Sequence, residues 1–538
     1  MGYSDKERRL LERHFSVLTP KEHGDIYCVH DLPPEVAATL NGVYSRSQLS
    51  MRDQFLDRLK KGLEASGKSL EDLEISESEP NYLTGLMSDK AGKFLKTYAI
   101  DHGHNSLREG SVVHLAIENV SQLVTRFIQR ERRCSFEESS TRYISFSKEG
   151  HWRDPEVLAA GGAAAEAYEE ILQITFELYQ EMSESLLAYL EAQRPLGEDE
   201  QRGPWLRALK AEAFDAARYL LTPAIHTKWG MVADARTLSD VITELVSHPL
   251  AEFRLVGERI KEQAESQLPT LLAHAGPNEY LAEQYAKTRE VAAAFDNPQR
   301  VLGEGQPGIE LLAYDADLDA KVLASTIYEQ SSAPYSDLLA RCKQMSTAER
   351  AAMMDEILAN RGKRDPLPFG TEGAQPFDFE LLVDFGAYRD IGRHRKGFQQ
   401  QQTLSTMHGY LTPPLIHDAG LAEPYAKVLD SVAALQQVVA SEHPYAAGYV
   451  TPFAFLQRVR ITFEPRQCAY FIELRSGPEG HFAYRQSAID LYQAIQEVSP
   501  LFASFIRVQE GGAFCGRMEA EQTADTRRAQ RMQRAGDL

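Results

Sequence analysis

The chain has 538 residues, enough for two large domains or about three of ordinary size. With 43% apolar and 25% charged residues it has an ordinary globular composition, and no apolar run approaches the ~20 residues of a membrane helix. The formal net charge of −20 argues against general binding to nucleic acid, because such binding depends on neutralising phosphates. We therefore expect any phosphate to be held by a local cluster of arginines.

The start of the chain and its cysteines point to a reducing compartment. The first ten residues, MGYSDKERRL, are polar and contain no apolar core for a secretory signal. The five cysteines form no CxxC pair, which argues against a disulfide framework and a zinc module. No other metal-ligand spacing is present, so the sequence predicts no metal site and a cytoplasmic protein.

In chain order, the sequence predicts a long helix, a linker, a strand, a second helix and a tail. Asp154 followed by Pro155 predicts a helix start. Apolar residues then recur every three or four positions, as they do again in the second half; they are Ile171, Ile174, Leu178, Met182 and Leu186, then Val428, Val432, Leu435 and Val439. Between the two helices, the polar, Gly- and Pro-rich segment 295–307 predicts a linker. Alternating apolar residues over 377–383 predict a half-buried strand that leads into a short helix.

An internal repeat relates the two halves. The segment from Glu109 reads EGSVVHLAIENVSQLVTRFIQRERRCSFEESSTRY, and the segment from Glu372 reads EGAQPFDFELLVDFGAYRDIGRHRKGFQQQQTLST. Aligned without a gap, they pair Arg126 with Arg389, Arg130 with Arg393, Arg132 with Arg395 and Ser140 with Thr403. We interpret this as a fused duplication of a helix-rich α+β module with a small mixed or antiparallel sheet.

The predicted domains follow from this repeat and the linker. We expect an N-terminal copy over residues 1–295, a linker over 296–309 and a C-terminal copy over 310–515. Residues 516–538 form a basic tail, predicted to be a solvated helix.

The repeated arginines suit phosphate binding, because a planar guanidinium holds a phosphate through two hydrogen bonds. Arg126 and Arg130 lie one helical turn apart. The alternative is that these arginines pair with nearby carboxylates, such as Glu131 or Asp390, on solvated surfaces. Surface ion pairs are worth only ~0–1 kcal/mol and give no reason to preserve the spacing. The duplicated register therefore favours a binding role.

At these residues the sequence resembles the flavin-dependent thymidylate synthases. Their signature is RHR, seven residues and Ser, followed by Gly-Arg-Tyr, with a His-x-Ser segment before it. The first half has HNSLREG from His104, then RER at 130–132, seven residues, Ser140 and Arg142. The second half has a literal RHR at 393–395, seven residues and a threonine. The resemblance covers roughly residues 95–270 and 360–500.

The resemblance implies a fold like that of the thymidylate synthase complementing proteins and synthesis of dTMP from dUMP. It implies FAD as the cofactor, with methylenetetrahydrofolate and NADPH as co-substrates. The implied FAD-binding residues are His104, Ser106, Arg130, Arg132, Arg393, His394 and Arg395. The implied dUMP-binding residues are Arg126, Ser140, Arg142, Arg218 and Arg236, and the residues implied in catalysis are Arg475, Ser140 and Arg142. It also implies a homodimer that mimics the family's homotetramer, with no nucleic-acid or membrane partner.

Neither half carries the complete set. The first half has Glu131 in place of the RHR histidine and Leu245 in place of the uracil-facing arginine. The second half has Thr403 in place of the serine and Gly448 in place of the phosphate-binding arginine. In one explanation, complementary half-sets meet between the halves. In the other, the dTMP chemistry is lost, which leaves a flavin or nucleotide binder or an enzyme for another pyrimidine.

Overall fold

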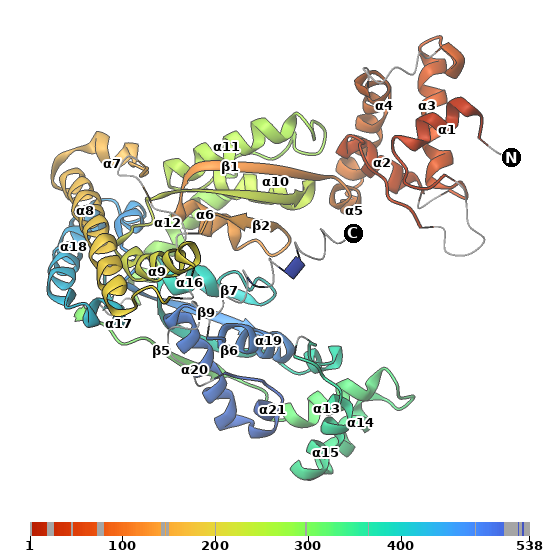
Figure 1. Ribbon diagram of the computed structural model, residues 1–538. Helices are drawn as coiled ribbons and strands as arrows, with labels where there is room; N and C mark the ends of the chain where they lie inside the picture. Colours follow the sequence, from red (N-terminus) through yellow and green to blue (C-terminus); the bar gives the residue numbers. More distant parts are fainter. Residues whose placement is uncertain are drawn as a thin grey trace. The chain divides into compact units, whose positions relative to one another are not determined.

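The computed structural model describes residues 3–18, 26–44, 47–72, 80–140, 146, 150–198, 201–295, 299–363, 365–478, 480–509, 526 and 530–531 (Figure 1). The chain forms two compact units. Unit 1 comprises Met1–Glu118, Arg133–Glu138 and Lys228–Asp296, and unit 2 comprises Asn119–Arg132, Ser139–Thr227 and Asn297–Leu538. No described helix combines the length and the apolar composition needed to cross a bilayer.

Unit 1 joins a helical N-terminal region to a small sheet. Its helices are α1 (Asp5–Glu12), α2 (Pro34–Tyr44), α3 (Met51–Ala65), α4 (Pro80–Leu95), α5 (Asn105–Glu109), α10 (Ala235–Val246), α11 (Ala251–Glu265) and α12 (Glu279–Ala293). The sheet has the order β1 (Val112–Ser121), β3 (His226–Asp234), β2 (Ser135–Glu138). The first three helices bury a core that includes Leu10, Phe15, Leu40 and Phe55. Gly42 allows α2 to approach α5 closely, because a Cβ there would overlap the Leu107 side chain.

Unit 2 contains a four-stranded antiparallel sheet of order β5 (Gly308–Ala313), β6 (Phe377–Asp384), β9 (Leu456–Phe463), β7 (Phe398–Gln401). A separate parallel pair joins β4 (Val301–Glu304) to β8 (His408–Tyr410). Its helices from the first half of the chain are α6 (Gln122–Gln129), α7 (Pro155–Ala160), α8 (Gly162–Gln193) and α9 (Arg202–Ala217). Those from the second half are α13 (Leu318–Tyr328), α14 (Tyr335–Gln344), α15 (Thr347–Leu358), α16 (Phe385–Ile391), α17 (Pro414–Asp418), α18 (Ala422–Glu442), α19 (Pro465–Arg475), α20 (Phe482–Val498) and α21 (Pro500–Ser504).

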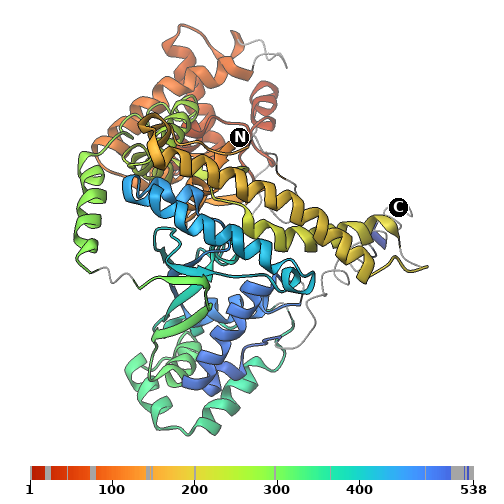
Figure 2. The same ribbon diagram turned by 90° about the vertical axis from the view of Figure 1, so that its left-hand side faces the viewer.

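The predicted strand over 377–383 is confirmed as β6, and its four alternating apolar residues are buried. The predicted helices over 171–186 and 428–439 are confirmed as α8 and α18, which lie side by side (Figure 2). Asp154 caps a helix as predicted, but that helix ends at Ala160. Gly161 and Gly162 interrupt it with φ of 68° and 69°, a backbone that glycine adopts without strain. Within the segment predicted as a linker, Val301–Glu304 forms β4.

The α+β fold consists of two copies of one module. In the first copy β1, α6 and β2 follow one another, as β6, α16 and β7 do in the second. The strands β2 and β7 start at positions separated by the same spacing as Arg126 and Arg389, so the ungapped repeat extends to secondary structure. Each copy then continues through a long helix, a central strand and two further helices: α8, β3, α10 and α11, or α18, β9, α19 and α20. Of the predicted basic tail, the structure describes only 526, 530 and 531.

Candidate functional site

The two copies meet inside unit 2 along a seam formed by 218–225 and 448–455. The backbone N–H of Ala224 donates to Tyr449 O (2.9 Å), and that of Ala454 donates to Tyr219 O (3.0 Å). These are equivalent positions, so the two hydrogen bonds are reciprocal. The packing of α8 against α18 extends the same association. The seam therefore holds corresponding residues of both copies within one compact unit.

Three arginines of the repeat are buried at this seam: Arg126, Arg218 and Arg389 are 6%, 1% and 3% exposed. Arg126 Nη1 donates to Arg389 O across the copies (3.1 Å). Arg218 Nη2 lies 3.5 Å from Gly386 O and 3.9 Å from Asp390 Oδ2. Backbone carbonyls thus accept from the Arg126 and Arg218 guanidiniums, and the Asp390 carboxylate lies near Arg218, so these two buried charges have polar partners. The dUMP-binding roles of Arg126 and Arg218 stay predictions.

The second copy holds a buried histidine and an arginine in direct contact. Arg475 Nε, at the end of α19, donates to His394 Nε2 (2.8 Å), and its Nη2 donates to Asp390 O (3.0 Å). Burial, together with the Arg475 charge, lowers the pKa of His394 to about 3, so this ring is neutral at pH 7. Because Nε2 accepts, Nδ1 carries the ring proton. The Arg475 guanidinium is thereby fixed by two acceptors.

Exposed cations and apolar side chains lie beside this pair. Arg393 is exposed, with its Nε 3.8 Å from Asp390 Oδ1, and Arg395 is half-buried. The Tyr470 ring, 51% exposed, lies 5.9 Å from the His394 ring. This surface therefore offers a planar anion two guanidinium cations and the aromatic face of Tyr470. The alternative of carboxylate pairing holds in part, because Asp390 interacts with both Arg218 and Arg393.

The equivalent turn in the first copy is also exposed. Arg130 caps α6, and its Cζ lies 3.9 Å from the centroid of the Phe127 ring. Arg132 is exposed, and Ser140 is half-buried. Arg142 lies outside the described residues.

Three other predicted residues belong to unit 1. His104 and Ser106 are exposed at the start of α5, and the His104 ring stacks 6.4 Å from Tyr98. Arg236 on α10 pairs with Glu109 (2.6 Å). The structure thus brings Arg126, Arg218, Arg393, His394 and Arg475 into unit 2 and places His104, Ser106 and Arg236 in unit 1.

Sequence reasoning missed a buried acid beneath the seam. Asp384 caps α16 by accepting from Ala387 N (2.6 Å). Burial raises the pKa of Asp384 to about 6, against the opposing hydrogen bond from the Ala387 amide. Tyr219 is itself fully buried, which raises the pKa of its hydroxyl well above the usual value. The signal was present in the sequence, because an Asp between a strand and a helix predicts an N-cap.

Among the described residues, no three His, Cys, Asp or Glu side chains are grouped as metal ligands.

Comparisons with known proteins cover both copies. A family model described as thymidylate synthase complementing protein matches residues 61–270 and 310–501. A UPF0159 protein of Chlamydia muridarum is 28% identical over 536 residues, which span 97% of this chain and 98% of that protein. A flavin-dependent thymidylate synthase of Nitratidesulfovibrio vulgaris is 28% identical over 204 residues, 38% of this chain and 76% of that protein. Among solved structures, the UMP/dUMP methylase PolB from Streptomyces cacaoi, bound with 5-Br dUMP, aligns with a TM-score of 0.31 and 12% identity over 38% of this chain and 96% of that one.

Proposed function

The chain belongs to the thymidylate synthase complementing protein family, and from this premise we propose that it is a flavin-dependent enzyme that methylates C5 of dUMP to form dTMP. The observation that carries the proposal is the Arg475–His394 pair of the second copy. In the sequence, this arginine matches the one that faces the uracil in the family, and the histidine matches the centre of its RHR motif.

The residues around the pair fit FAD by their chemistry. A flavin dinucleotide has an anionic pyrophosphate and a planar ring. Arg393 and Arg395 supply cations able to hold phosphate oxygens, and the exposed Tyr470 supplies an aromatic face. When bound, reduced FAD supplies hydride, and methylenetetrahydrofolate supplies the one-carbon unit. NADPH is proposed as the reductant of the flavin.

The protein's own contribution is orientation and positive charge. Arg475 has five N–H donors, and its contacts with His394 and Asp390 fix the guanidinium plane while leaving other N–H groups to donate. Those donors favour a uracil ring that carries negative charge, as deprotonation at N3 produces. Because His394 is neutral and acts through Arg475, we assign it as a positioning residue. Ser140, Arg142 and Arg218 keep their proposed role toward the dUMP phosphate.

The test is a reaction with the full chain. Protein loaded with FAD is mixed with NADPH, methylenetetrahydrofolate and dUMP tritiated at C5, and tritium release to water is measured. We expect release to require all three small molecules, and NADPH to bleach the flavin faster when dUMP is present. Protein that retains FAD and binds dUMP, yet releases no tritium, would overturn the proposal.

The second candidate is a nucleotide-binding protein without catalysis. It is favoured by the fully buried Leu245 at the first-copy position equivalent to Arg475 and by Gly448 at the position equivalent to Arg218. Calorimetric binding of dUMP without tritium release would establish this candidate in place of the first.

A further inference from the structure

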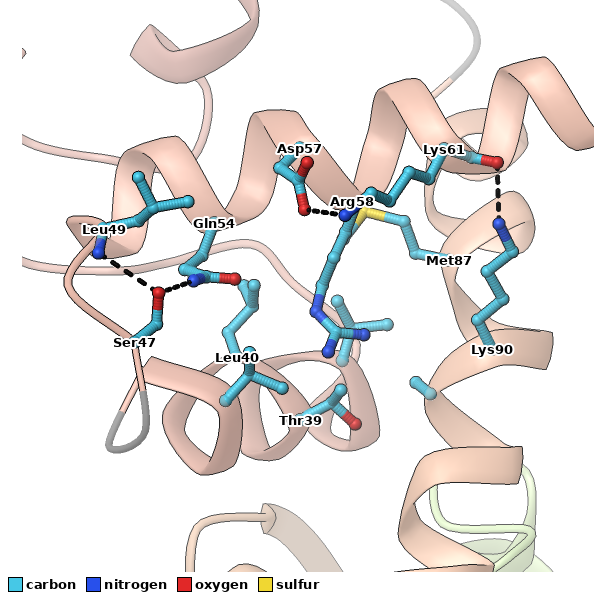
Figure 3. Close-up of a pocket in the computed structure, with 13 residues that line it drawn as sticks. Thr39, Leu40, Ser47, Leu49, Gln54, Asp57, Arg58, Lys61, Met87 and Lys90 are labelled. Carbon is cyan, nitrogen blue, oxygen red and sulfur yellow. Dashed lines mark hydrogen bonds and ion pairs between the residues drawn. The ribbon is translucent and has the colours of Figure 1, made fainter.

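A cavity of about 450 Å³ lies among α2, α3 and α4 of unit 1 (Figure 3). Its described lining comes mainly from residues that precede the family match at residue 61. None of the arginines assigned to FAD or dUMP contributes to it. The cavity, which we call the N-terminal pocket, therefore shares no described lining residue with the site of the proposed function, and its size suits a metabolite.

The central polar group of the N-terminal pocket is Arg58. It is half-buried, and burial lowers the pKa of its guanidinium. Its Nε is buried and has no hydrogen-bond acceptor among the described residues, while its Cζ lies 5.6 Å from the centroid of the Phe94 ring. Figure 3 shows the side chain extending from α3 toward Thr39 on α2. Because a buried donor without an acceptor is costly and the group is a cation, this position favours an anionic ligand.

The other charges of the pocket add to this preference. Lys61 Nζ pairs with Asp57 (2.8 Å), so that carboxylate is already neutralised by a cation other than Arg58. Lys90 Nζ donates to the Lys61 carbonyl (2.7 Å), which uses one of its three N–H donors. The described lining thus has three cations and one carboxylate, in a chain whose net charge is −20. The local field attracts anions although the whole chain repels them.

The remaining wall offers both apolar and polar groups. Val36, Leu40 and Met87 present aliphatic or thioether groups, whereas Thr39 Oγ1 is buried without a hydrogen-bond partner in the described structure. A fully hydrated ion such as free phosphate would leave the apolar wall uncovered. A ligand with an anionic head and an apolar body satisfies both surfaces.

We propose that the N-terminal pocket binds a small organic anion, whose carboxylate or phosphate head contacts Arg58 and whose apolar body packs against Leu40 and Met87. The proposal does not depend on catalysis at the seam.

Calorimetric titration of the full chain tests it, with octanoate and octyl phosphate as probes and octanol as the neutral match. We expect at least one anion to bind in a 1:1 ratio and octanol to bind at least about tenfold more weakly, since a hydrogen bond to a charged group contributes that much. Binding of octanoate alone assigns a carboxylate head, and binding of octyl phosphate alone assigns a phosphate head. Equal binding of octanol, or no binding of any probe, overturns the proposal.

Variants locate the binding. Arg58→Gln should weaken the anion about tenfold or more, Arg58→Lys should retain most of the affinity, and Arg9→Gln, an exposed arginine on α1, should change nothing. Ala91→Leu should block the cavity, with circular dichroism as the check on folding. If Arg58→Gln fails to fold, Ala91→Leu and the octanol comparison still decide. Unchanged affinity in folded Arg58→Gln or Ala91→Leu protein would place the anion elsewhere and refute the proposal.

Discussion

The helices α10 and α19 occupy the same place in the two copies but end differently. Leu245 near the end of α10 is fully buried. A Cβ added at Gly257 of α11 would lie 2.7 Å from the Leu245 Cβ, so the two helices pack closely there. Arg475 at the end of α19 is half-buried and meets two polar acceptors. The first copy thus fills this position with a buried leucine, whereas the second copy has an arginine there that donates hydrogen bonds to two acceptors.

The opposite exchange occurs at the seam. The first copy has the buried Arg218, which reaches Gly386 O and Asp390, whereas the second has Gly448 at the equivalent position. Each copy has therefore lost one cation that the other retains. This complementarity favours one working constellation built from both copies over two independent ones.

The largest effect is expected from restoring the lost cation in the first copy. Leu245→Arg should destabilise the protein by about 4 kcal/mol or more, because a charge would be placed at a fully buried apolar position packed against α11. Chemical denaturation followed by circular dichroism measures the change. Leu245→Met is the matched control and should cost less than ~1.5 kcal/mol. If Leu245→Arg is as stable as the control, the first-copy position is not closed as described.

The next effect concerns the cation that remains. Arg475→Gln should lower the rate of tritium release about 100-fold, because a donor aimed at developing negative charge is worth that much. Arg341→Gln, an exposed arginine on α14, is the control and should leave the rate unchanged. If folded Arg475→Gln protein, checked by circular dichroism, releases tritium at the wild-type rate, Arg475 does not face the reacting ring.

Much of this arrangement could be predicted from sequence. The Arg-x3-Arg-x-Arg spacing predicted the duplication, because it recurs in register in two segments of the chain, and the alternation over 377–383 predicted β6, because strand formation depends on local periodicity. The reciprocal hydrogen bonds of Ala224 and Ala454 could not be predicted, since they depend on how two distant segments pack.

The contacts of individual arginines could not be predicted from the sequence either. Nothing in the sequence distinguishes Arg126, which is buried against a backbone carbonyl, from Arg130, which is exposed over an aromatic ring. The N-terminal pocket was missed for the same reason, because its lining comes from three separate helices.

The third prediction uses the opposite titrations of His394 and Asp384. The pKa of His394 falls from 6.5 to about 3 on folding, so the unfolded chain binds the proton first and stability is lost as the pH falls from about 6.5 toward 3. The pKa of Asp384 rises from 3.8 to about 6, so stability is lost as the pH rises from about 4 to 6. In the wild-type chain, the two groups therefore change the free energy of unfolding in opposite directions as the pH is lowered.

A variant that lacks one of these two groups should show the pH dependence of stability that the other group causes. As the pH is lowered from 6 to 4.5, the free energy of unfolding of His394→Gln should rise relative to that of the wild type by up to about 1.4 kcal/mol per pH unit. Over the same range, the free energy of unfolding of Asp384→Asn should fall relative to that of the wild type by a similar amount per pH unit. Urea unfolding at several pH values measures both, and parallel stability curves for all three proteins would contradict the assignment.

The smallest effect compares the two exposed turns. Arg393→Gln should weaken FAD binding up to about tenfold, while stability changes by less than ~1 kcal/mol because Arg393 is exposed and its Nε lies 3.8 Å from Asp390 Oδ1. Arg130→Gln, the equivalent change in the first copy, should weaken FAD less, because the adjacent Glu131 already opposes an anion there, whereas His394 beside Arg393 is neutral. Fluorescence titration with FAD measures both. A larger loss in Arg130→Gln would assign the flavin phosphates to the first copy and reverse the specialisation argued above.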